Sequence, residues 1–197
     1  MFWRKMKIQI KDVAHPVGVY QDKLIQLIDE VSERKDIAYQ VPYAELASIY
    51  DELDPEPDID IALFNEKYAR VQAHHNRLCK VLTETLQEYK IWQTFLGRAK
   101  NLYKKAKNNI FTTDDTIRAL RNKDLQEAAL QEKIPDLVDL IDNLEIIVDE
   151  LKEEVGIVKL KCDLLDKANT NMNRQQKVVE DEIGLGYKVG VRVNLRT

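Results

Sequence analysis

Between Phe64 and Ile110, mainly apolar residues recur in alternating steps of four and three positions without a slip. No proline interrupts this run, and Gly97 is its only glycine. Such a stripe predicts one long α-helix whose seam packs against another helix. The stripe consists of Phe64, Tyr68, Val71, His75, Leu78, Leu82, Thr85, Tyr89, Trp92, Leu96, Ala99, Tyr103, Ala106 and Ile110.

A second stripe with the same spacing runs from Ile134 to Ile183. Pro135 suits the first turn of a helix, where a missing N–H costs nothing, and Gly184 suits the end of one. We therefore predict long helices over 61–110 and 135–183. The tip between them, 111–134, is expected to hold two short helices near 114–121 and 124–133, because Asp114 and Asp124 resemble helix starts.

Charge predicts how the two long helices are arranged. From Lys90 to Thr113 there are six basic residues and no acidic one, whereas Pro135 to Glu154 holds eight acidic residues and only Lys152 as a base. Since these blocks flank the tip, an antiparallel hairpin brings opposite charges face to face, and a parallel arrangement separates them.

The two ends of the chain carry other patterns. Apolar spacing over 24–31 and 42–53 predicts two short helices, followed by an acidic bend at 51–60. Apolar and polar residues alternate over 6–11 and 187–196, which is typical of half-buried strands. We expect an all-α fold: a long antiparallel coiled-coil helical hairpin with two short N-terminal helices and small β-strands at both termini. The predicted parts are 1–60, a hairpin at 61–184, and a strand tail at 185–197.

Composition and motifs exclude several classes of protein. The net charge is −4, charged residues make up 32% of the chain, and no apolar run approaches the ~18 residues of a spanning helix. The start of the chain lacks the apolar core of a signal peptide. Nucleotide-binding loops, zinc-protease signatures and nucleophile elbows are missing. We expect a non-enzymatic, cytoplasmic protein without a cofactor or membrane contact.

The residues with metal-ligand chemistry are His74, His75 and Cys79, to which the hairpin could add Cys162. His75 and Cys79 lie four residues apart and so share a helix face. If positions near 110 and 135 are opposite, Cys79 falls near Asp166, within about one turn of Cys162. His75 occupies a seam position, however, as do Asn169 and Gln176. We favour a buried polar layer that sets the helix register, and we predict no metal.

A basic stretch with interleaved aromatic residues is the candidate binding site. Single-stranded nucleic acid is held by a positive groove and by aromatic faces on which bases stack. The same lysines also suit a second interpretation, in which they form a solvated face or pair with the acidic helix opposite. The predicted nucleic-acid-binding residues are Arg98, Lys100, Lys104, Lys105, Lys107, Arg118 and Arg121, and the aromatic ones are Trp92, Phe95, Tyr103 and Phe111.

The order of these features resembles the UvsY-type recombination mediators of T4-like bacteriophages. The likeness covers about 51–180 and rests on the acidic entry Asp58-Ile59-Asp60, the pair His74-His75, the stretch 98–104 and the tip 118–122. The resemblance implies a small oligomeric helical protein that binds single-stranded DNA. It also implies a role in loading a recombinase onto strands covered by single-strand-binding protein. By this resemblance Arg98, Lys100, Lys104 and Lys105 would be the DNA contacts.

An isolated hairpin buries little core for its length, so a homo-oligomer is expected. Residues that widen the second stripe would contact other subunits or the first helices, and the C-terminal strand would add to a neighbour's sheet edge. The alternative function is a structural or assembly component, for example of a phage virion, with the coiled coil as a spacer. The predicted interface residues are Leu140, Ile147, Leu160, Leu164, Val189, Val191 and Val193.

Overall fold

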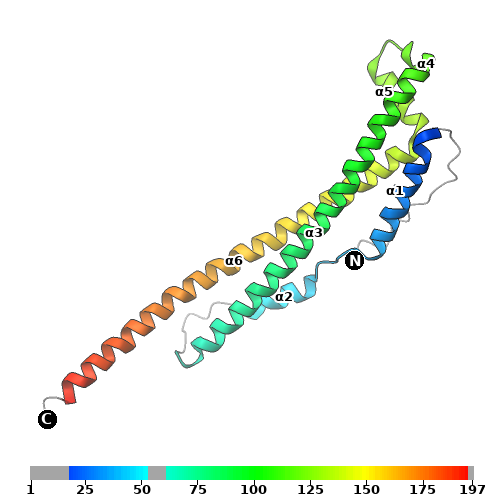
Figure 1. The fold of residues 1–197 in the computed structure, drawn as a ribbon. Coiled ribbons are helices and arrows are strands. Elements are labelled where there is room, and N and C mark those ends of the chain that lie inside the picture. The colour runs from blue at the N-terminus through cyan, green and yellow to red at the C-terminus, as the bar shows by residue number, and fades with distance from the viewer. Residues whose placement is uncertain (1–17, 53–60, 195–197) are drawn as a thin grey trace. The chain divides into compact units, whose positions relative to one another are not determined.

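The computed structural model describes residues 18–52 and 61–194, and over these residues it is all-helical (Figure 1). The prediction of an all-α fold with two long helices packed against each other is confirmed. The six helices are α1 (Gly18–Asp36), α2 (Tyr43–Glu52), α3 (Ile61–Thr113), α4 (Asp115–Arg118), α5 (Lys123–Lys133) and α6 (Pro135–Asn194).

The chain divides into two compact units, and each long helix contributes a segment to both. Unit 1 comprises Met1–Tyr39 and Gln87–Lys152, which include α1, α4 and α5. Unit 2 comprises Gln40–Leu86 and Glu153–Thr197, which include α2.

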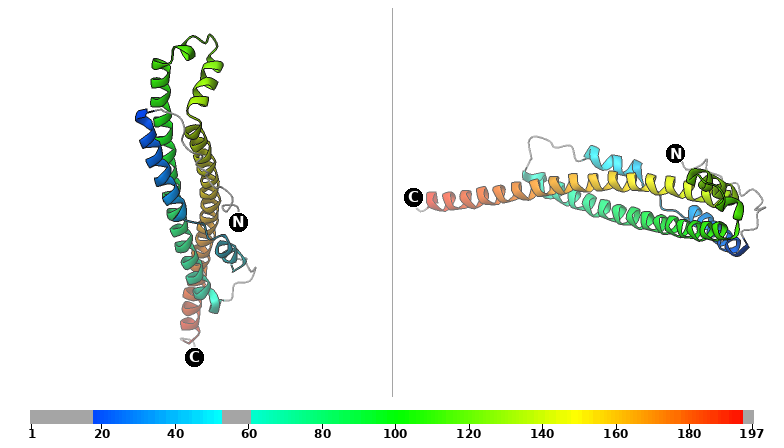
Figure 2. Two further views of the ribbon diagram at one scale, coloured as in Figure 1. Left: turned by 90° about the vertical axis from the view of Figure 1, so that its right-hand side faces the viewer. Right: turned by 90° about the horizontal axis from the view of Figure 1, so that it is seen from above.

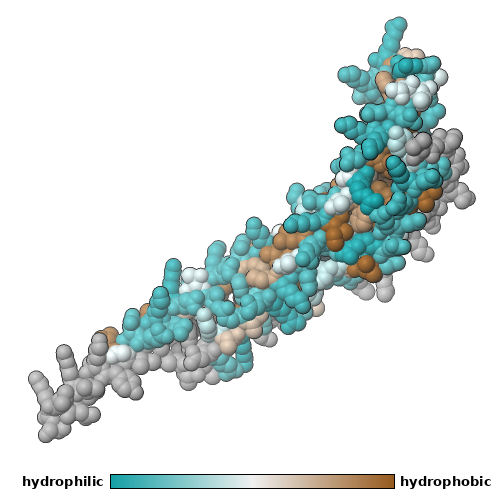
Figure 3. All heavy atoms as spheres, in the orientation of Figure 1, coloured by the Kyte–Doolittle hydropathy of each residue, from teal (hydrophilic) through white to brown (hydrophobic). Residues whose placement is uncertain are grey.

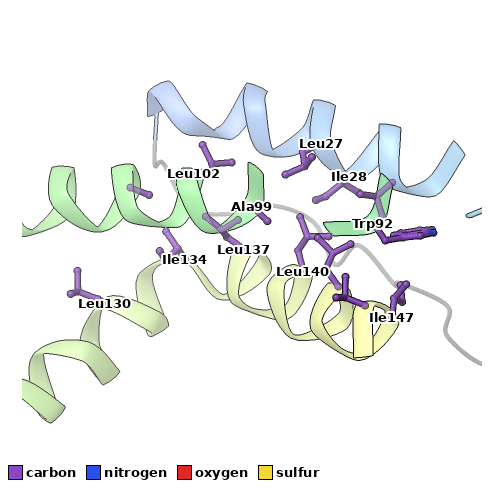
Figure 4. Close-up of a cluster of buried hydrophobic side chains, with 14 of the residues drawn as sticks. Leu27, Ile28, Trp92, Ala99, Leu102, Leu130, Ile134, Leu137, Leu140 and Ile147 are labelled. Atoms are coloured by element: carbon purple, nitrogen blue, oxygen red, sulfur yellow. The ribbon is translucent and has the colours of Figure 1, made fainter. Parts of the chain in front are cut away.

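Unit 1 is built on a cluster of buried apolar side chains from α1, α3, α4, α5 and α6 (Figure 4). Leu27 and Ile28 bring α1 onto the long helices, and Trp92 is completely buried in α3. The beginning of α6 contributes Leu137 and Leu144 to the same cluster. The views in Figure 2 show α1 lying alongside α3. The first helix is therefore an integral part of the hairpin core, since it covers apolar surface that two helices leave exposed.

Unit 2 pairs the beginning of α3 with the later part of α6. Gln72 Nε2 donates to Asn169 Oδ1 at 2.6 Å, and His75 Nε2 lies 2.7 Å from Asp166 Oδ1. Residue numbers rise along one helix as they fall along the other, so these segments run antiparallel, as predicted. Leu78, Val158 and Leu165 are buried in the same unit and make the rest of the seam apolar.

The tip has the two short helices expected, with shifted bounds. The Asp114 side chain caps α4 by accepting the Thr116 backbone N–H at 3.0 Å. The cap of α5 is Asn122 instead of Asp124, because the Asn122 side chain accepts the Asp124 backbone N–H at 2.8 Å. The turn between the helices is held by Gln126 Nε2, which donates to the Leu120 carbonyl at 2.6 Å.

The prediction of a C-terminal strand is wrong. Helix α6 continues through Gly184 to Asn194, so the helix end predicted at 183 is wrong, and the predicted strand tail is helical over its described residues, 185–194. No described glycine has a positive φ, and Gly184 therefore does not end the helix. A glycine inside a helix costs only about 1 kcal/mol relative to alanine, whereas a lone strand without a partner has no stability of its own.

Two other predictions lie outside the described residues. These are the N-terminal strand at 6–11 and most of the acidic bend at 51–60, whose residues 53–60 are not described. Within the described residues, no helix has the length and apolar character needed to cross a membrane.

Candidate nucleic-acid interface

All seven predicted nucleic-acid-binding residues belong to unit 1. Five lie on the last turns of α3, Arg118 ends α4, and Arg121 follows in the turn before α5. The geometry of the hairpin thus gathers the predicted cations at one end of α3 and in the tip that follows it. Their ion pairs divide them into two groups.

Four of the seven cations are paired with carboxylates of the same unit. Lys100 Nζ lies 2.7 Å from Glu145 Oε1 on α6, which is the contact between basic and acidic blocks that the charge pattern predicted. Arg98 pairs with Glu30 on α1, and its guanidinium holds the pKa of Glu30 below its ordinary value. Lys107 pairs with Glu127 on α5, and Arg118 pairs with Asp115 within α4. Arg98, Lys100 and Lys107 thus join elements of unit 1 to one another, whereas Arg118 pairs within its own helix.

The remaining three cations, Lys104, Lys105 and Arg121, are exposed. None of them has an ion-pair partner within residues 18–52 and 61–194. Lys123, at the start of α5, shares both properties. We call these four residues, at the end of α3 and in the tip, the free cations. Their charge is available to an external anion, as is that of Lys23, Lys90 and Lys152, which lie farther from the tip in sequence.

The aromatic residues of the stretch are mostly engaged in packing. Trp92 is fully buried, and its Nε1 donates to Glu88 Oε1 at 2.7 Å. Tyr103 donates its hydroxyl to Glu127 Oε1 at 2.6 Å, and burial raises the pKa of Tyr103 to about 12. Phe95 is half-buried, with the Arg98 guanidinium 5.8 Å from its ring centroid. Phe111 is 38% exposed, so it is the aromatic residue of the predicted set that offers an open ring face.

Glu127 on α5 is the centre of the contacts that fasten the tip to α3. It accepts from Lys107 Nζ and from the Tyr103 hydroxyl. The Lys107 ammonium is the main cause that holds the pKa of Glu127 below its ordinary value, and the Tyr103 hydroxyl adds to it. The carboxylate therefore stays ionised and keeps two donors of α3 in place.

A buried charged group in unit 1 was not predicted. Glu88 is 2% exposed and accepts from Arg34 of α1 as well as from Trp92. In the sequence, the one signal for this network is an acidic residue four positions before a tryptophan of the apolar stripe. Its basic partner lies 54 residues away on α1, so only the tertiary structure brings it to Glu88.

The His and Cys residues of unit 2 form a polar layer across the seam, close to the register that the sequence indicated. The Cys79 thiol lies 3.7 Å from His75 Nε2, and His75 in turn contacts Asp166. Burial, together with the neighbouring Cys79, raises the pKa of Cys162 to about 11. Among the described residues, no group of three His, Cys, Asp or Glu side chains could hold a metal ion.

The predicted interface residues fall into three groups. Leu140 and Ile147 are buried in the unit 1 core, in the same cluster as Leu27 and Ile28 of α1. They are consequently not available to another subunit. Leu160 and Leu164 are 61% and 45% exposed on α6 in unit 2. The side chains of Val189, Val191 and Val193 lie outside the described residues, although α6 is helical there.

Comparisons with known proteins bring no further identification. No family model, no curated protein and no solved structure matches this chain. The function has to be inferred from the surfaces of the two units. Figure 3 shows one face, which is mostly hydrophilic with hydrophobic patches over the long helices.

Proposed function

We propose that this chain is a non-enzymatic helical accessory protein that binds single-stranded DNA with unit 1. The observation that carries the proposal is the group of free cations, Lys104, Lys105, Arg121 and Lys123, which are exposed in the same unit as the exposed residue Phe111. Cations without a carboxylate partner can neutralise phosphates at no cost to internal ion pairs. An exposed aromatic face adds a stacking surface that accepts any base.

The resemblance to UvsY-type mediators extends this proposal to assistance in loading a recombinase. In that role the protein would hold a strand that is being cleared of single-strand-binding protein, and the recombinase would be a second partner. Binding through backbone phosphates suits such a task, because it is independent of sequence.

The salt dependence of binding tests how many cations make contact. For single strands, the logarithm of affinity falls with the logarithm of salt by about 0.7 per phosphate contact. Three contacts from Lys104, Lys105 and Arg121 predict a slope of about −2, and all seven predicted cations together would give about −5. We expect a slope between −2 and −3, measured by fluorescence anisotropy of a labelled oligothymidylate.

Charge reversal of the free cations supplies the direct test. Lys104→Glu with Lys105→Glu should abolish binding at low salt, since each substitution replaces an attraction to phosphate by a repulsion. The matched control is Lys159→Glu with Lys177→Glu, which makes the same charge change at exposed positions of unit 2. Undetectable binding of the unmodified chain at low salt, or equal loss in both double variants, would refute the proposal.

A structural or assembly role is the second candidate. It is favoured by the large apolar residues that α6 exposes, among them Ile157, Leu160 and Leu185. The sequence predicted that a C-terminal strand would join the subunits. Because α6 is helical to Asn194, this strand cannot serve as the joining element. If this candidate is correct, Lys104→Glu with Lys105→Glu would leave the protein able to assemble.

A further inference from the structure

A short apolar patch lies on the surface of α6 in unit 2. Ile157, Leu160 and Leu164 are 44%, 61% and 45% exposed. Steps of three and four residues place them on one face of the helix. The neighbouring residues Val158 and Cys162 are buried in the seam with α3, so the patch is a second apolar face of the same segment. A helix that is apolar on two faces is typical of one that packs on two sides.

The patch has a charge of opposite sign at each end. Glu153 lies seven residues before Leu160, and Lys167 lies seven residues after it. Since seven residues are close to two helical turns, both side chains share the face of the patch. Both are exposed, and neither has an ion-pair partner within the part of the chain that the structure describes.

We propose that this face docks onto the same face of a second copy of the chain, with the two α6 helices antiparallel and a two-fold axis near Leu160. In this arrangement Glu153 of each copy faces Lys167 of the other, and both ion pairs form at once. Ile157 and Leu164 of opposite copies then cover each other. A parallel arrangement would place Glu153 against Glu153 and Lys167 against Lys167, which is repulsive.

The small size of the patch predicts the strength of the contact. Stable interfaces bury about 1,200–2,000 Å² in total, and three side chains from each copy supply less. We therefore expect a reversible dimer that is populated at tens of micromolar protein and not at nanomolar protein. The inference concerns unit 2 and does not depend on DNA binding by unit 1.

Sedimentation equilibrium of the full chain, from about 5 to 200 µM, tests the self-association. Leu160→Glu should raise the dissociation constant at least tenfold, because it replaces a leucine at the centre of the contact by a carboxylate that would have to be buried. Leu185→Glu is the matched control, since Leu185 is also 61% exposed on α6 but lies outside the patch. A chain that stays monomeric at 200 µM, or two variants that weaken association equally, would overturn the proposal.

Charge exchange tests the pairing. Glu153→Lys alone and Lys167→Glu alone should each weaken the dimer, and the double exchange should restore it. If another surface mediates association, the double exchange has no reason to restore the dimer. A double variant that stays as weak as the single variants would therefore contradict the proposal.

Disulfide trapping tests the orientation. In a background with Cys79→Ala and Cys162→Ala, a Glu153→Cys chain is mixed with a Lys167→Cys chain under mild oxidation. Antiparallel docking predicts mainly the mixed 153–167 cross-link. Cross-links of each variant with itself, in preference to the mixed product, would show parallel docking and overturn the proposed geometry.

Discussion

The buried ion pair between Glu88 and Arg34 should be the most sensitive point of unit 1. Arg34→Met removes the ion-pair partner of a carboxylate that is 2% exposed and leaves it the hydrogen bond from Trp92 Nε1. Breaking a buried pair by removing one partner costs about 3–5 kcal/mol, because the remaining charge is uncompensated. The Arg34 side chain is 24% exposed, so water screens part of the pair and we expect about 3 kcal/mol.

The compensated double variant separates charge from packing. Arg34→Met combined with Glu88→Leu removes both charges and should bring the free energy of unfolding back to within about 1 kcal/mol of the unmodified chain. A surface pair serves as the control: Arg70 and Glu66 are 64% and 59% exposed, and Arg70→Met should cost about 0.5 kcal/mol or less.

Urea unfolding followed by circular dichroism at 222 nm and by tryptophan fluorescence measures these differences. The chain has two tryptophans, so every variant carries Trp3→Phe; the fluorescence of Trp92 then reports on unit 1 and should carry the change. A cost below about 1 kcal/mol for Arg34→Met, similar to that of the surface control, would show that Glu88 is not a buried carboxylate that depends on Arg34.

Three further substitutions have defined outcomes. Asp114→Ala removes the cap of α4 and should lower the free energy of unfolding by about 1 kcal/mol in urea titrations. The pKa of Glu127 is lowered in the folded protein, so the ionised carboxylate stabilises the fold at neutral pH. This contribution is lost as the pH falls through the folded-state pKa. Glu127→Gln should therefore reduce the decrease in melting temperature that acid causes. Gly97→Ala should raise stability by about 0.5–1 kcal/mol, measured by thermal unfolding, because an added Cβ meets no atom within 4 Å.

Much of the fold could be predicted from local pattern. The stripes at 64–110 and 134–183 correspond to α3 and most of α6, because the spacing of apolar residues along the sequence reveals a helix directly. The antiparallel pairing followed from the two charge blocks, and Lys100 with Glu145 is the contact they predicted. The end of α6 was mispredicted, since alternating apolar residues and a glycine fit a strand as well as a helix until the presence of a partner is known.

The candidate site depended on tertiary structure to a greater degree. Sequence identified seven cations, but it could not tell which would meet a carboxylate, because Glu30 and Glu127 come from other helices. For the same reason, the sequence could not tell which aromatic residues would be exposed. Trp92 lies in the core cluster with residues of α1 and α6, and this burial depends on packing, not on spacing along the chain.

The sequence by itself determined that this protein is helical, that two long helices run antiparallel, and that positive charge gathers near the hairpin tip. These properties arise from the spacing and sign of residues that are close along the chain. Only the tertiary structure decided that Lys104, Lys105 and Arg121 keep their charge available, and that Leu160 faces outward while Leu140 is buried in the unit 1 core. Pairing and burial are set by residues that are distant in sequence, and folding alone brings them together.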